Sequence, residues 1–243
     1  MKPLLSVVMP AYNEEECITK VVTNWIIFLE RFIGSGTFHF IVVNDGSKDE
    51  TGKILDGLEH EHSQLMVVHQ ENGGHGKAVI EGYAKAISLG SEWIFQVDSD
   101  DQFEISDFAK LWENRNKSKF ILGYRRIRYD AVSRLLITRI LRFALFVFFG
   151  ENILDSNIPF RLMEGDFLSM LLKKLPDEYP FAPNIFLAVL ARKNGQQTID
   201  IPVKHKDRQT GTISILRWNL LRVCFRSLKE LIVFRASLLK HSS

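Results

Sequence analysis

The sequence has few of the features that would place it among disulfide-rich, secreted or membrane-spanning proteins. Its 243 residues include only two cysteines, Cys17 and Cys224, which lie far apart and form neither a disulfide framework nor a zinc-binding pattern. The N-terminus lacks the long apolar stretch of a signal peptide, and no uncharged run is long enough to span a membrane. Internal repeats and low-complexity segments are also absent. We therefore expect an ordered globular protein of a reducing compartment, cytoplasmic in location.

The net charge of +2 hides an uneven distribution of charge along the chain. Residues 125–150 and 204–243 together hold 15 basic and 3 acidic side chains, so the remainder is strongly acidic. Both basic segments are also rich in apolar residues. This combination is typical of proteins that bind an anionic surface or substrate, and we expect a membrane surface and no nucleic acid.

Apolar runs alternate with helical patterns through the first half of the chain. Strands are predicted at 4–9, 38–43, 65–69, 93–97 and 120–124, with helices between them from about residues 14, 51, 78 and 108. Further helices are predicted at 132–149, 166–174 and 184–193, and a last strand at 198–203. This order predicts an α/β fold with a mostly parallel sheet and helices on both faces.

Polar motifs follow four of the predicted strands, at residues 12–14, 44–47, 72–77 and 98–102. Because ligands of such sheets bind beyond the carboxyl ends of the strands, we expect the four motifs to share one rim. In the last motif, Asp98 and Asp100 would point to the same side if they continue the strand, with the Gln102 amide as a further oxygen ligand. Oxygen ligands favour Mg²⁺ or Mn²⁺. An isolated pair of this kind can equally be an exposed acidic turn.

The motifs together resemble glycosyltransferase family 2. The resemblance is carried by Pro10-Ala11-Tyr12-Asn13-Glu14, Val43-Asn44-Asp45-Gly46-Ser47, Asn72-Gly73-Gly74-His75-Gly76 and Asp98-Ser99-Asp100. Within the family, Asp98-Ser99-Asp100-Asp101-Gln102, Gly123-Tyr124-Arg125 and His205…Arg208…Gly211 are similar to dolichol-phosphate mannose synthase and bacterial polyprenyl-phosphate glycosyltransferases. The resemblance implies a single-domain, Rossmann-like GT-A fold and inverting transfer of a sugar from a GDP- or UDP-sugar.

The resemblance also assigns roles to single residues. It implies nucleoside contacts for Pro10, Tyr12, Glu14, Val43 and Asp45. It implies that Asp98, Asp100 and Gln102 hold the metal and the diphosphate, with Ser99 beside them. Arg125 and Arg134 would bind the acceptor phosphate, and Arg208 the donor diphosphate. The catalytic set is then Asp98, Asp100, Arg125 and Arg208.

The nature of the acceptor decides whether the enzyme needs a general base. A polyprenyl phosphate is already anionic and needs only cations, whereas a hydroxyl of a polysaccharide or a lipid-linked glycan needs a carboxylate base. The nearby candidates for that base are Glu164, Asp166, Asp177 and Glu178, and none belongs to a clear motif. The hydroxyl alternative would use Asp177 or Glu178 as its base. We therefore favour the phosphate acceptor over the hydroxyl, and both over a non-catalytic membrane-binding module.

Two segments are predicted to contact the membrane. Residues 132–150 form a helix with arginines on one side, typical of a membrane-interface helix or of an ordinary core helix with a wide buried face. We assign residues 1–212 to the GT-A domain and residues 213–243 to a basic amphipathic helical tail. The protein should then associate peripherally with the cytoplasmic membrane face, and an oligomer is possible.

Overall fold

The computed structural model describes residues 2–125, 132–176, 182–195, 198–206 and 229–236. The first half of the chain alternates strands and helices as expected. Its elements are β1 (Leu5–Ala11), α1 (Ile18–Ile33), β2 (Phe38–Asp45), α2 (Thr51–Glu61), β3 (Leu65–Gln70), α3 (His75–Ser88) and β4 (Trp93–Gln96). The second half contains α4 (Asp107–Glu113), the short 3₁₀ helix η1 (Arg115–Lys117), β5 (Phe120–Arg125), α5 (Val132–Phe149), β6 (Arg161–Glu164), α6 (Gly165–Leu172), α7 (Pro183–Lys193) and β7 (Ile199–Val203).

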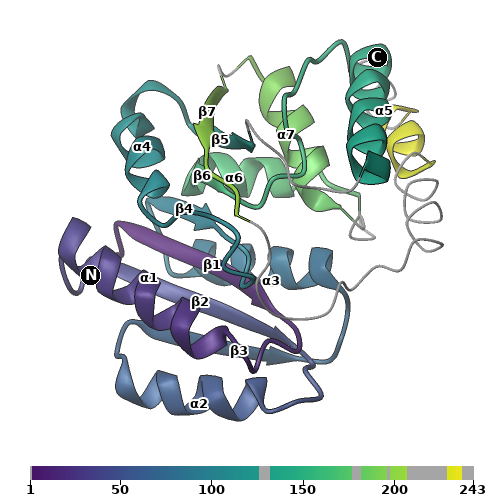
Figure 1. The fold of residues 1–243 in the computed structure, drawn as a ribbon. Coiled ribbons are helices and arrows are strands. Elements are labelled where there is room, and N and C mark those ends of the chain that lie inside the picture. Colours follow the sequence, from purple (N-terminus) through teal and green to yellow (C-terminus); the bar gives the residue numbers. More distant parts are fainter. Residues whose placement is uncertain (1, 126–131, 177–181, 196–197, 207–228, 237–243) are drawn as a thin grey trace.

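The strands form one seven-stranded sheet in the order β3-β2-β1-β4-β6-β5-β7 (Figure 1). Every neighbouring pair is parallel except the two pairs that involve β6. The chain moves outward from β1 to β3 and then returns to β4, so right-handed crossovers place α1 and α2 on one face and α3 on the other. The predicted α/β class with a mostly parallel sheet is confirmed.

Strand β6 was not predicted. The sequence pattern indicates a loop through Arg161 and a helix from Asp166, whereas residues Arg161–Glu164 form an antiparallel strand between β4 and β5. The strand is only four residues long and begins with a fully buried arginine, so it lacks the apolar run that marks the other buried strands.

An aromatic cluster joins the two halves of the sheet beneath the loop that follows β4. The ring of Phe95 in β4 lies 5.5 Å from Trp25 of α1, 4.9 Å from Phe108 of α4 and 4.8 Å from Phe160, just before β6. All four side chains are buried. The cluster gives the carboxyl end of β4 a rigid base.

The short segment 229–236 is helical and packs beside α5 (Figure 1). It belongs to the predicted C-terminal tail, most of which lies outside the described residues, so the division at residue 212 stays a prediction. Within the part of the chain that the structure describes, no helix is long and apolar enough to cross a membrane.

Candidate active site

The loops after β1 and β2 are joined by reciprocal hydrogen bonds. The Asn13 amide donates to Ser47 Oγ (3.0 Å), and the Lys48 amide donates back to Asn13 Oδ1 (2.8 Å). The Glu14 amide donates to Thr51 Oγ1 at 2.8 Å. Asn13 has φ of 54°, a left-handed conformation that asparagine tolerates better than most residues. The two loops therefore form one preorganised rim, on which Glu14 is held in place.

The residues predicted to contact the nucleoside differ in their exposure. Tyr12 is 40% exposed at this rim, whereas the side chains of Pro10 and Val43 are buried within their strands. Pro10 lies beyond Val8, the last β1 residue paired with β4, so its missing N–H leaves no gap in that ladder. The nucleoside contacts themselves stay predictions.

Asp45, at the end of β2, holds the loop that leads into α3. Its carboxylate accepts hydrogen bonds from the amides of Gly73 (2.8 Å) and Gly74 (2.9 Å) and from the side chain of Gln70 (2.6 Å). Asp45 therefore supports α3 and not α2, the next helix along the chain, where Asp49 Oδ1 accepts from the Thr51 amide at 3.0 Å. Helix α3 consequently begins at His75, three residues before its predicted start.

The acidic motif lies in a turn and not on a strand. Strand β4 ends at Gln96, and Asp101 adopts a left-handed φ of 54° that turns the chain. The strand alternation invoked for Asp98 and Asp100 therefore does not apply, although both follow β4 at the rim as expected. Asp100 Oδ1 accepts from the Gln102 amide at 3.3 Å.

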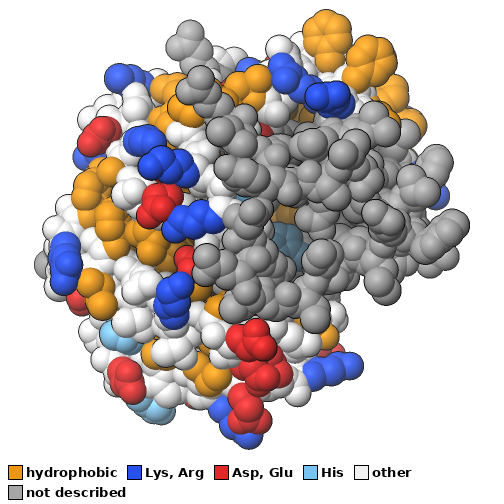
Figure 2. All heavy atoms as spheres, viewed as in Figure 1, with side chains coloured by type: hydrophobic (Ala, Val, Ile, Leu, Met, Phe, Trp, Pro, Cys, Tyr) orange, Lys and Arg blue, Asp and Glu red, His pale blue; other side chains and the backbone are white. Residues whose placement is uncertain are grey.

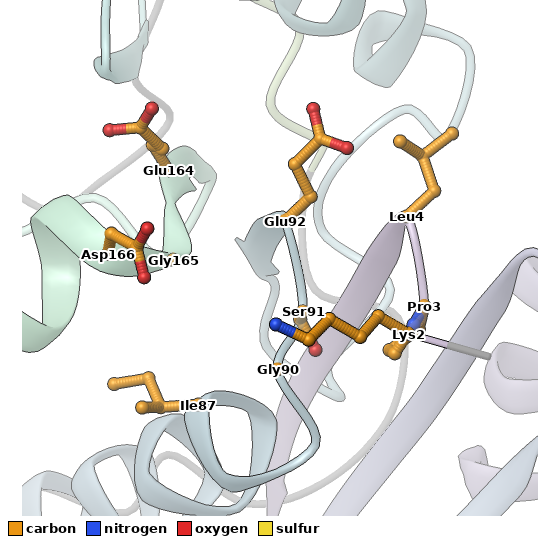
Figure 3. A pocket seen from close by; sticks show the side chains of 10 residues that line it. All are labelled: Lys2, Pro3, Leu4, Ile87, Gly90, Ser91, Glu92, Glu164, Gly165 and Asp166. Carbon is orange, nitrogen blue, oxygen red and sulfur yellow. The ribbon is translucent and has the colours of Figure 1, made fainter.

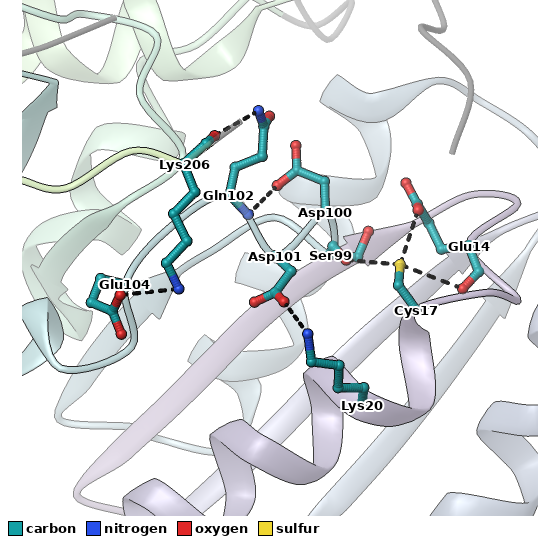
Figure 4. Close-up of polar contacts among 9 residues, drawn as sticks. All are labelled: Glu14, Cys17, Lys20, Ser99, Asp100, Asp101, Gln102, Glu104 and Lys206. Carbon is teal, nitrogen blue, oxygen red and sulfur yellow. Dashed lines mark hydrogen bonds and ion pairs between the residues drawn. The ribbon is translucent and has the colours of Figure 1, made fainter. Parts of the chain in front are cut away.

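Two neighbours fix this turn. Ser99 is buried, and its carbonyl accepts a weak hydrogen bond from the Cys17 thiol (3.5 Å), which also contacts a Glu14 carboxylate oxygen at 3.2 Å (Figure 4). On the other side, His75 Nε2 lies 3.8 Å from Asp98 Oδ1. Burial lowers the pKa of His75, and the negative charges of Asp100 and Asp45 partly offset this shift. About half of the His75 side chain is nevertheless exposed.

Asp98, Asp100 and Gln102 offer oxygen ligands of the kind that Mg²⁺ or Mn²⁺ prefers. Among the described residues, no group of three or more acidic, histidine or cysteine side chains is arranged to enclose a metal ion. The chemistry of the three side chains fits a divalent metal, and their role as its ligands stays a prediction.

Gln102 also connects the acidic motif to the segment that directly follows β7. Its side-chain amide donates to the Lys206 carbonyl (3.3 Å), and the Lys206 amide donates to the Gln102 carbonyl (2.7 Å) (Figure 4). The Lys206 ammonium pairs with Glu104 at 3.0 Å. We call Gln102, Glu104 and Lys206 the anchor. It starts the predicted His205…Arg208 loop beside the acidic motif, while Arg208 itself lies outside the described residues.

Arg125, at the end of β5, forms a bidentate ion pair. Its Nε and Nη2 atoms lie 2.8 and 3.0 Å from the two carboxylate oxygens of Asp155, which is 4% exposed. The pair fixes the plane of the guanidinium group. The role of Asp155 was missed because the two residues are 30 positions apart. The side chain of Arg134, the other predicted acceptor ligand, lies outside the described residues.

Strand register places Arg125 at the same edge as the acidic motif. Arg161 of β6 pairs with Gln96 of β4 on one side and with Leu122 of β5 on the other. Because β4 and β5 both run antiparallel to β6, they run in the same direction. Arg125 lies three residues beyond Leu122, and Asp98 lies two residues beyond Gln96.

Arg161 is a fully buried cation for which the sequence predicted no role. Its guanidinium group donates to the carbonyls of Ser156, Ile158 and Asn184. Burial lowers the pKa of Arg161 to about 10, and electrostatic interactions with Tyr83 and nearby aspartates limit this shift. The guanidinium group therefore stays charged at neutral pH. It supplies a fixed positive charge beneath the rim.

Glu164 and Asp166 lie at the opposite end of the sheet. Glu164 pairs with Trp93, the first residue of β4, whereas Asp98 follows Gln96, the last residue of that strand and about 10 Å further along it. With Glu92 and Lys2, the two acids line a cavity of about 480 Å³ near the start of β1 (Figure 3). Two of the four candidate bases are therefore excluded, while Asp177 and Glu178 lie outside the described residues.

Comparison with known proteins gives consistent matches. The model of the family described as glycosyl transferase family 2 matches residues 6–173. The chain is 30% identical over 229 residues to a dolichyl-phosphate β-glucosyltransferase of Trichomonas vaginalis. This match covers 87% of this chain and 68% of the relative. It is 28% identical over 222 residues to a UDP-N-acetylglucosamine–dolichyl-phosphate N-acetylglucosaminyltransferase of Methanococcus voltae, with 83% and 85% covered.

Two further comparisons have lower sequence identity. An undecaprenyl-phosphate 4-deoxy-4-formamido-L-arabinose transferase of Pectobacterium atrosepticum is 25% identical, with 86% of this chain and 61% of the relative covered. The crystal structure of glucosyl-3-phosphoglycerate synthase from Mycobacterium tuberculosis with Mn²⁺, UDP and phosphoglyceric acid superimposes with a TM-score of 0.69. Its identity is 18%, and the match covers 96% of this chain and 78% of that one, so it supports the GT-A fold alone.

Proposed function

Since the chain belongs to glycosyl transferase family 2 and is therefore a glycosyltransferase, we propose that it transfers a sugar from a nucleotide-sugar to a polyprenyl phosphate. The reaction we propose inverts the anomeric centre and depends on a divalent metal. Relatives named for transfer to dolichyl and undecaprenyl phosphate support the acceptor class. These relatives are named for the transfer of different sugars.

The observation that carries the proposal is the distribution of charge around the sheet. Glu164 and Asp166, two of the carboxylates that could have served as a base for a hydroxyl acceptor, lie at the far end of the sheet. The cation Arg125 lies at the same edge as Asp98 and Asp100. An acceptor that is already an anion needs a cation and no base, and this arrangement fits that requirement.

On the donor side, Asp98, Asp100 and the Gln102 amide would hold Mg²⁺ or Mn²⁺. When bound, the metal offsets the negative charge that develops on the departing diphosphate. Tyr12, Glu14 and Asp45 would orient the nucleoside on the rim. The hydrogen bonds between the β1 and β2 loops fix that rim before the substrate arrives, so little ordering entropy is lost on binding.

On the acceptor side, Arg125 would bind the phosphate, with Arg134 and Arg208 as further predicted cations. Asp155 holds the Arg125 guanidinium in one orientation, so a phosphate oxygen meets a preset donor. Attack by that oxygen on the anomeric carbon, from the face opposite the diphosphate, forms the new bond as the bond to the diphosphate breaks. The sugar configuration is thereby inverted.

The test is turnover with purified full-length protein, a panel of UDP- and GDP-sugars, Mn²⁺ or Mg²⁺ and a detergent-solubilised polyprenyl phosphate. We expect release of nucleoside diphosphate that requires both the metal and the lipid phosphate. Asp100→Asn should lower kcat about a thousandfold, because a charged metal ligand is replaced by a neutral one. Equal turnover without metal, or turnover only with a hydroxyl acceptor, would contradict the proposal.

A further inference from the structure

Helix α5 carries a row of large apolar side chains that face away from the protein core. Ile140, Phe143, Phe146 and Val147 are 56%, 68%, 58% and 55% exposed. The opposite side of the helix is buried through Leu145 and its neighbours. An ordinary core helix would bury its apolar residues and expose polar ones, so the outward row needs an explanation.

The helical segment 229–236 packs beside α5 and also carries exposed apolar side chains. Its Phe234 is buried, and the ring lies 6.1 Å from that of Phe149 at the end of α5, which fixes the segment beside the helix. On its outer side, Ile232 and Val233 are 50% and 59% exposed. We call these two residues and the four outward residues of α5 the apolar face. Figure 2 shows hydrophobic side chains gathered at this edge of the molecule.

The charges that border the apolar face are mostly positive. Arg139 and Arg142 of α5 are exposed, as is Lys229, and α5 contains no acidic residue. Basic side chains lie beside the hydrophobic ones in Figure 2. A two-fold contact between copies through this face would bring like charges together, which disfavours self-association. Anionic lipid head groups above an acyl layer match both the charge and the apolar row.

We propose that the apolar face inserts into the interface of an anionic membrane as a monotopic anchor. This inference deepens the proposed function and rests on it for its purpose, which is to bring a lipid phosphate to Arg125. The loop from Gly150 to Asp155 links the two features, because it starts at the end of α5 and ends at the carboxylate that holds Arg125. Membrane insertion of α5 would thus set the height of the acceptor site above the bilayer.

The experiment is co-sedimentation of the full chain with vesicles, in the absence of nucleotide-sugar and polyprenyl phosphate. Vesicles of phosphatidylcholine with about one third phosphatidylglycerol are compared with pure phosphatidylcholine. We expect preferential binding to the anionic vesicles. The double variant Phe143→Gln, Phe146→Gln should bind about a hundredfold more weakly, since two inserted aromatic side chains are lost. Arg139→Gln should lose about fivefold on anionic vesicles and little on neutral ones.

A matched control exists on α1, where Ile27 and Phe32 are each 38% exposed far from α5 in the sequence. The variant Ile27→Gln, Phe32→Gln should bind vesicles like the unmodified protein. Equal binding by the Phe143/Phe146 variant, or no binding by the unmodified protein, would overturn the inference. So would a dimer in solution that this variant abolishes while neither protein binds vesicles. Because no substrate is present, failure here is separate from failure of the turnover assay.

Discussion

The carboxylate of Asp45 is predicted to be a structural support for the site as well as a ligand for the nucleoside. It is 3% exposed and accepts from the amides of Gly73 and Gly74 and from Gln70. In Asp45→Asn one oxygen becomes an NH₂ group that faces an N–H donor. The unsatisfied contact costs about 1–3 kcal/mol. Loss of negative charge at the start of α3 adds about 0.3–1 kcal/mol.

These costs predict a measurable loss of thermal stability. A total of about 1.3–4 kcal/mol corresponds to a fall in Tm of about 3–16 °C in a protein of this size. Asp56→Asn is the matched control, because Asp56 also bonds a side chain, at 2.9 Å from His69, but is 59% exposed. Its loss should be below about 1 kcal/mol. Thermal unfolding followed by circular dichroism measures both variants, and equal shifts would refute the reasoning.

The same variant separates the structural role of Asp45 from its predicted role in binding. A bound nucleotide-sugar at a hundred times its Kd stabilises a protein by about 2.7 kcal/mol. If Asp45 only supports the loop, a folded Asp45→Asn protein keeps that stabilisation at a saturating concentration of ligand. If it also contacts the nucleoside, the Kd rises and the shift at the same ligand concentration falls. We expect the second result.

Three further predictions concern residues away from this loop. Glu164→Gln should leave kcat unchanged within about twofold in the turnover assay, because Glu164 lies at the far end of the sheet. A large loss of kcat would instead indicate that Glu164 acts as a general base. Glu104→Lys and Lys206→Glu should each impair donor binding, seen as a raised KM, and the double charge swap should restore the original KM. A double variant with an unrestored KM would show that the Glu104–Lys206 ion pair does not support donor binding. Gly46→Ala should lower Tm more than Gly74→Ala, because a Cβ at Gly46 would lie 2.6 Å from the Asn72 backbone nitrogen, whereas Gly74 faces open space; the reverse order would contradict this.

The features that the sequence predicted well are those set by local pattern. The alternation of strands and helices through β5 and the location of the motif loops at the strand ends both follow from short-range periodicity. The extent of α5, Val132–Phe149, was also predicted correctly, because a long apolar helix is a strong local signal.

The features that it missed depend on contacts between distant segments. The insertion of β6 between β4 and β5 is visible only in the sheet order, and it is this strand that carries Glu164 away from the site and buries Arg161. The pairing of Asp155 with Arg125 likewise joins two elements across a long stretch of chain. Sequence patterns report which residues are polar, but not which polar residues a sheet brings to the same edge.

The most direct test of the central claim is ³¹P NMR of a reaction that contains polyprenyl phosphate, the accepted nucleotide-sugar and the metal. The account predicts that the phosphomonoester signal of the lipid falls while a phosphodiester signal rises, coupled to the anomeric proton of the transferred sugar. Asp100→Asn should leave the monoester signal unchanged. Consumption of the donor with an unchanged monoester signal, and the sugar found on a hydroxyl group, would contradict the account.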